Sequence, residues 1–106
     1  MNPYLQRREL LVRMEAARRQ TENHLARLHA GIERQAEATV IRIRTKRRQY
    51  GRHATTWTPA DEREYERQLV LGREGRAPEI EALSRKLRRQ GEAIDGFRAL
   101  HGINAA

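Results

Sequence analysis

The chain has 106 residues, of which 38% are apolar and 34% are charged, and none is cysteine. This length and composition allow one modest hydrophobic core, and they exclude disulfides, thiol nucleophiles and cysteine-ligated metal sites. The formal net charge is +8, from 22 Lys and Arg against 14 Asp and Glu, which favours a partner that carries negative charge.

Residues 3–50 are rich in good helix formers, and Gly31 is the one glycine among them. Asn2 can cap the first turn, and Gly51 can end the helix in a left-handed conformation. The sequence therefore predicts one long helix, which forms most of a basic helical arm over residues 1–52.

The apolar residues of this helix follow a repeat that is harder to assign. A seven-residue repeat through Leu11, Leu25 and Ile32 also places Arg18 in the seam, so we favour an eleven-residue repeat, which leaves the apolar stripe nearly straight. Such a stripe must pack against the rest of the chain or against a second copy. The eleven-residue positions are Leu10, Thr21, Ile32 and Ile43; Met14, Leu25 and Ala36; and Ala17, Leu28, Thr39 and Tyr50.

The positive charge is concentrated in the first half of the chain. Residues 1–52 carry thirteen Lys and Arg against five acids, whereas residues 53–106 carry nine of each. No acid interrupts the sequence between Glu37 and Asp61, and a cluster of this kind suits a polyanion because binding releases counterions. The candidate phosphate-binding residues in this segment are Arg42, Arg44, Lys46, Arg47, Arg48 and Arg52.

Residues 53–106 predict a small three-helix domain, so the fold class is all-α. Thr58 and Pro59 can begin a helix that ends near Leu71, because Gly72 and Gly75 follow. Ala77-Pro78 can begin another helix, and after Arg88-Arg89-Gln90-Gly91 the residues Ile94, Phe97 and Leu100 again follow at helical spacing. The expected core residues are Trp57, Tyr65, Leu69, Ile80, Leu83, Leu87, Ile94 and Phe97.

Residues 57–103 resemble the Myb/SANT-like class of three-helix, helix-turn-helix domains. The resemblance is carried by Trp57-Thr58-Pro59 with Asp61-Glu62, by Tyr65, Leu69 and Gly72, and by Glu79-Ile80, Leu83, Leu87, Ala93-Ile94 and Arg98. It implies a turn at Arg89-Gln90-Gly91 and a recognition helix over 92–100, although Glu92 and Asp95 would then face a nucleic acid with negative charge. Around that turn, the candidate nucleic-acid-binding residues are Arg85, Lys86, Arg88, Arg89 and Arg98.

An alternative architecture follows from the spacing of the same apolar residues. They also fit a seven-residue repeat with Gln90 in the seam, so residues 78–101 could form one continuous helix. Helices over 58–71 and 78–101 would then form the broken return arm of an antiparallel helical hairpin.

The sequence predicts a binding protein and no enzyme. The four histidines lack metal-ligand spacing, and the glycines form no nucleotide-binding loop, so we expect no metal and no cofactor.

The leading hypothesis is a protein that binds nucleic acid, with duplex DNA preferred. The alternative is a helical-hairpin or coiled-coil adaptor that binds an acidic protein, and helix 3–50 could also pair with a second copy as a homo-oligomer. Charged residues break every apolar run near the N-terminus, so we expect a cytoplasmic protein without a membrane segment.

Overall fold

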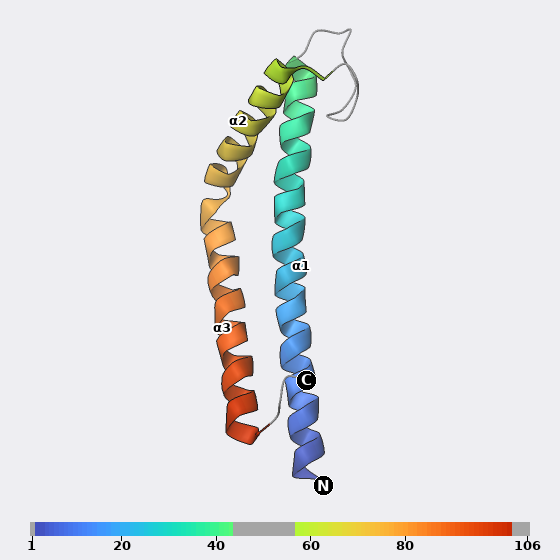
Figure 1. Ribbon diagram of the computed structural model, residues 1–106, viewed down its shortest axis with the longest axis vertical. Coiled ribbons are helices and arrows are strands. Elements are labelled where there is room, and N and C mark those ends of the chain that lie inside the picture. Colours follow the sequence, from blue (N-terminus) through green and yellow to red (C-terminus); the bar gives the residue numbers. More distant parts are fainter. Residues whose placement is uncertain (1, 44–56, 103–106) are drawn as a thin grey trace. The chain divides into compact units, whose positions relative to one another are not determined.

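The computed structural model describes residues 2–43 and 57–102, and these ranges are helical almost throughout (Figure 1). Helix α1 spans Pro3–Ile43, α2 spans Pro59–Gly75 and α3 spans Ala77–His101. The described residues contain no strand. The predicted all-α fold class is therefore confirmed.

Side chains and a proline define where α1 and α2 begin. The side-chain oxygen of Asn2 accepts a hydrogen bond from the Tyr4 amide at 2.9 Å. The Thr58 hydroxyl accepts one from the Asp61 amide at 3.1 Å, and the Asp61 carboxylate accepts one from the Thr58 amide at 2.9 Å. Each bond satisfies an amide that the first helical turn leaves unpaired, so the predicted helix starts are correct.

The return half of the chain differs from the predicted three-helix domain. Helix α2 continues through Gly72 to Gly75 instead of ending near Leu71. Helix α3 runs without interruption through residues 88–91, so the predicted turn is wrong and the continuous helix of the alternative is correct. Gly91 costs up to about 1 kcal/mol of helix propensity relative to Ala, which the packing of α3 against α1 outweighs. The helix ends at Gly102, whose φ of 64° suits glycine.

The chain divides into two compact units, and each draws on both halves of the sequence. Unit 1 comprises residues 1–26 and 81–106, and unit 2 comprises residues 27–80. The sequence had predicted a division near residue 52. The two units do not coincide with those halves, because the apolar face of α1 packs against return-arm residues within each unit.

In unit 1, the first part of α1 packs antiparallel to α3 (Figure 1). Leu11 and Ile94 are buried at its core, and the half-buried Met14 and Phe97 pack against them. Arg98 of α3 donates a hydrogen bond to the Glu15 carboxylate of α1 at 2.8 Å. The contact therefore combines a small apolar core with an ion pair at its edge.

In unit 2, the last part of α1 packs antiparallel to α2. Ala36, Val40 and Tyr65 form the buried core, with the half-buried Trp57 and Leu69 packed against it. The Trp57 and Tyr65 rings meet edge to face, with centroids 6.3 Å apart. Of the eight core residues expected from the sequence, three are buried and five are half-buried. The buried ones are Tyr65, Leu83 and Ile94, and the half-buried ones are Trp57, Leu69, Ile80, Leu87 and Phe97.

The burial pattern of α1 corrects the predicted repeat. From Leu11 to Ile32, each position of a seven-residue repeat is buried or half-buried, including Arg18. Leu10 is 46% exposed and Ile43 is 61% exposed, so the eleven-residue stripe fails at both ends. The seam positions are Leu11, Met14, Arg18, Thr21, Leu25, Leu28 and Ile32. Arg18 can occupy the seam because its guanidinium lies beside Gly91 of α3, which has no side chain. After Ile32 the buried residues follow at intervals of four, at Ala36 and Val40.

Candidate nucleic-acid interface

Five of the predicted phosphate-binding residues lie outside the described residues. They are Arg44, Lys46, Arg47, Arg48 and Arg52, and they belong to the segment that joins α1 to α2. By sequence, residues 44–56 hold five bases and no acid, whereas the helical residues 3–43 hold eight bases and five acids. Most of the net charge of the chain is therefore carried by this connecting segment.

Arg42 is the one member of that cluster that the structure describes. It lies exposed in the last turn of α1, and its guanidinium donates a hydrogen bond to the Thr39 hydroxyl at 3.1 Å. The Thr39 hydroxyl in turn donates to the carbonyl of Gln35 at 2.8 Å. Arg42 forms no ion pair with a described residue, so its charge is available to an anion. Its position at the C-terminal end of a helix is also electrostatically favourable.

A second group of predicted residues lies on the exposed face of α3. Arg85 and Arg89 are one turn apart and point away from the buried Leu83 and Ile94. At 3.6 residues per turn, their spacings from these two residues turn both arginines roughly 120 to 180° away from them. Lys86 and Arg88 flank them, and all four side chains are exposed. We call these four residues the α3 basic face.

Little charge within the protein neutralises the α3 basic face. Arg85 approaches the Glu81 carboxylate only to 4.0 Å, and Lys86, Arg88 and Arg89 form no ion pair with a described residue. On α2, by contrast, Arg67 pairs with Glu64 at 3.3 Å. The α3 basic face is therefore a compact patch of four cations open to an external anion.

Arg98 does not belong to that patch. The sequence placed it with the nucleic-acid-binding residues, but its side chain is 24% exposed and its guanidinium pairs with Glu15. The reason is its place on α3, since it lies next to the buried face that includes Ile94 and Phe97. Its charge is already neutralised, so the structure gives Arg98 a packing role between α1 and α3.

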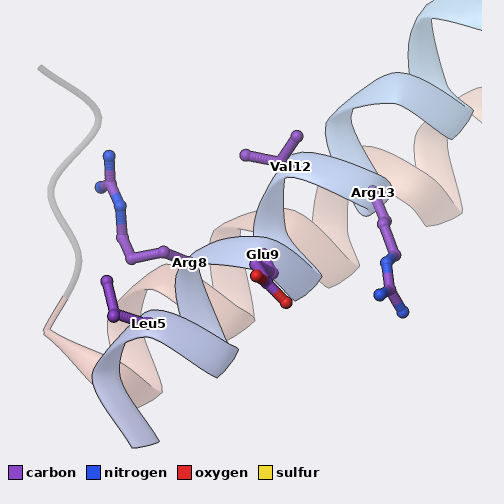
Figure 2. Close-up of a pocket in the computed structure, with 5 residues that line it drawn as sticks. All are labelled: Leu5, Arg8, Glu9, Val12 and Arg13. Carbon is purple, nitrogen blue, oxygen red and sulfur yellow. The ribbon is translucent and has the colours of Figure 1, made fainter. Parts of the chain in front are cut away.

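The sequence interpretation missed a shallow groove on the first three turns of α1. Figure 2 shows the five residues that line it, Leu5, Arg8, Glu9, Val12 and Arg13. Leu5 and Val12 are 58% and 59% exposed, and they lie seven residues apart on a face that α3 does not cover. The seven-residue spacing of Leu5 and Val12 is visible in the sequence, but the sequence prediction considered only the apolar stripe on the other side of the helix.

The pKa of the Glu64 side chain is shifted. Gln68 and Arg67 donate hydrogen bonds to the Glu64 carboxylate, and these bonds lower the pKa of Glu64 below its ordinary value. Such bonds favour the charged carboxylate without supplying an acid or a base for catalysis.

Among the described residues, no three His, Asp or Glu side chains gather to ligate a metal ion. No described helix combines the length and apolar character that crossing a membrane requires.

The chain matches no protein-family model, no curated protein and no solved structure.

Proposed function

We propose that this protein binds nucleic acid without catalysing a reaction, and that it recognises the phosphate backbone, with duplex DNA as the preferred form. The observation that carries the proposal is the concentration of bases in two parts of the sequence. Residues 44–56 contain five bases and no acid, and the α3 basic face adds four more with no ion pair shorter than 4.0 Å.

The geometry of α3 favours contact with phosphate over reading of bases. A recognition helix presents polar and basic side chains to base edges, whereas the exposed residues of α3 beyond the basic face include Glu92 and Asp95. The helix is also continuous where a helix-turn-helix would bend. Phosphate contacts carry no sequence information, so the binding we propose is strongly dependent on salt and weakly dependent on sequence.

Titration of a fluorescent duplex of arbitrary sequence at several salt concentrations tests the proposal. Two variants each remove four positive charges. One changes Arg44, Lys46, Arg47 and Arg48 to Gln, and the other changes Arg85, Lys86, Arg88 and Arg89 to Gln. Each lost phosphate contact lowers the slope of log K against log salt by roughly 0.9, so four lost contacts lower it by roughly 3 to 4.

A third variant controls for net charge. Changing Arg63, Arg67, Arg73 and Arg76 to Gln removes the same charge from α2 and from the residue that follows it. Arg67 already pairs with Glu64, and Arg76 already pairs with Glu79 of α3. We expect this variant to retain most of its affinity. Equal losses in all three variants would mean that net charge alone attracts the duplex, and no binding at low salt would reject the proposal.

A second candidate function is an adaptor that binds an acidic protein partner. The groove on α1 favours it, because Leu5 and Val12 expose apolar surface there. The bases Arg8 and Arg13 line the same groove, together with Glu9 (Figure 2). An acidic amphipathic helix would complement both features. Changing Leu5 and Val12 to Ser should abolish binding to such a partner and leave duplex binding intact, which separates the two functions.

A further inference from the structure

Helices α1 and α3 both carry a regular seven-residue seam in unit 1, and this regularity creates a problem of register. Along α3 the positions of a seven-residue repeat are buried or half-buried, and they are Leu83, Leu87, Gln90, Ile94, Phe97 and His101. On α1 the seam runs from Leu11 through Leu25 within the same unit. Sliding one helix by seven residues would again place seam on seam, so apolar packing alone selects the register weakly.

The observed contacts show which residues face each other. Leu11 and Met14 pack with Ile94 and Phe97. Because the helices are antiparallel, continuing this pairing along the seam places Arg18 opposite Gln90. The Arg18 guanidinium does lie beside the residue after Gln90, since a Cβ atom added at Gly91 would be 3.6 Å from the Arg18 Cζ.

This Arg18–Gln90 layer is polar on both sides. Neither Arg18 Nε nor Gln90 Oε1 has a hydrogen-bond partner among the described residues, although Arg18 Nε lies 3.4 Å from a carboxylate oxygen of Glu22. The Arg18 side chain as a whole is 43% exposed, but its Nε atom is buried. Buried polar atoms without partners cost stability, so apolar residues at both positions would pack better. The layer therefore needs a reason other than stability.

We propose that the Arg18–Gln90 layer sets the register in which α1 and α3 pair. A slip of seven residues in either direction places Arg18 opposite an apolar residue, Phe97 or Leu83, and Gln90 opposite Leu25 or Leu11. In the observed register Arg18 and Gln90 face each other, whereas in a slipped register each of them would face an apolar residue. A single polar layer fixes the register of coiled coils by the same energetics.

The neighbouring ion pair cannot set the register by itself. Arg98 pairs with Glu15, and Glu22 lies seven residues further along α1 on the same face. A slip in that direction gives Arg98 a new carboxylate partner, and the opposite slip places it near Arg8. The ion pair thus disfavours one slip only, and the Arg18–Gln90 layer is needed to disfavour the other.

Disulfide trapping tests this proposal, because the chain has no cysteine of its own. The pair Glu15→Cys and Arg98→Cys reports the observed register, and the pair Glu22→Cys and Arg98→Cys reports the slipped one. Each pair is placed in the wild-type background and in a background with Arg18→Leu and Gln90→Leu. We expect the apolar background to melt at a higher temperature and to raise the rate of slipped-pair disulfide formation roughly tenfold, the factor that corresponds to about 1.4 kcal/mol.

A conservative variant separates register from packing. Arg18→Gln keeps a polar layer with Gln90, and we expect its slipped-pair rate to equal that of the wild type. An unchanged slipped-pair rate in the apolar background would overturn the proposal whether the melting temperature rises or falls. Slipped-pair disulfides that form as fast as observed-register disulfides in the wild-type background would also overturn it, because the polar layer would then not select a register. The test measures monomeric protein without nucleic acid, so its outcome is independent of the proposed function.

Discussion

Units 1 and 2 both pair α1 with the return arm, but they use different side chains to do so. In unit 1 the contact combines four apolar residues with the Glu15–Arg98 ion pair and the Arg18–Gln90 layer. In unit 2 the helices meet through an aromatic cluster and through Gly72, where an added Cβ atom would lie 2.8 Å from Ile32 Cγ2. Unit 1 thus gains specificity from polar groups, whereas unit 2 gains close packing from a missing side chain.

The largest expected effect tests whether the small apolar core of unit 1 is essential. Ile94 is 2% exposed, so Ile94→Ala removes buried surface and leaves a cavity. We expect a loss of about 2 to 5 kcal/mol in the free energy of unfolding, measured by chemical denaturation. Leu100, which is 78% exposed, provides the control, because Leu100→Ala should change stability by about 0.5 kcal/mol or less. Equal losses in both variants would contradict the assignment of the core.

The next prediction tests the close approach in unit 2. Gly72→Ala places a methyl group against Ile32, and we expect it to cost about 1 to 3 kcal/mol, less up to about 1 kcal/mol of gained helix propensity. Gly75→Ala is the matched control in the same helix, since an added Cβ there meets no atom within 4 Å. Thermal denaturation of both variants should show opposite signs, and stabilisation by Gly72→Ala would show that the helices can separate without cost.

A smaller effect is expected from the ion pair of unit 1. Glu15 and Arg98 are 35% and 24% exposed, so solvent screens their attraction only in part. A double-mutant cycle with Glu15→Gln and Arg98→Gln should give a coupling free energy of about 1 kcal/mol that decreases at high salt. The pair Glu64 and Arg67 on α2 is more exposed and offers a comparison. If the coupling free energy of Glu15 and Arg98 is as small as that of Glu64 and Arg67, the ion pair does not stabilise unit 1.

Gly96 provides the smallest change in stability and tests the continuity of α3. An added Cβ at Gly96 meets no atom within 4 Å, so Gly96→Ala should stabilise the protein by up to about 1 kcal/mol through helix propensity. Helicity measured by circular dichroism should stay the same or rise. Destabilisation would instead indicate a backbone conformation at Gly96 that alanine cannot adopt.

A pH effect specific to unit 2 follows from Glu64. Its pKa is lowered in the folded protein, so its contribution to stability is present above the ordinary pKa and is lost as the pH falls through the lowered value. Gln68→Leu removes the strongest cause, and we expect the pKa of Glu64 to rise toward its ordinary value in an NMR titration. A titration unchanged by this substitution would show that Arg67 alone holds the carboxylate.

The helix starts could be predicted from the sequence because their signals are local. Asn2 and Thr58 cap helices through contacts within four residues, and Ala77-Pro78 begins α3 as expected. The continuity of α3 could not be decided in this way. Gly91 signals a break locally, while the packing of Ile94 against Leu11, more than eighty positions away in sequence, favours an unbroken helix.

The candidate interface was predictable in part for the same reason. Exposure of the α3 basic face follows from helical spacing once the buried face is known. The role of this face in binding nucleic acid stays a prediction. The pairing of Arg98 with Glu15 depends on the register between two helices, which no local pattern encodes. The bases from Arg44 to Arg52 stay a prediction from sequence.

The single tryptophan of the chain has a consequence for measuring these effects. Trp57 lies in unit 2, packed edge to face on Tyr65, and its indole nitrogen donates a hydrogen bond to Glu62 at 2.9 Å. Indole emission therefore reports the unfolding of unit 2, whereas far-ultraviolet ellipticity reports the helices of both units. The gap between the two unfolding curves measures, in one unlabelled sample, how far the two units unfold as one.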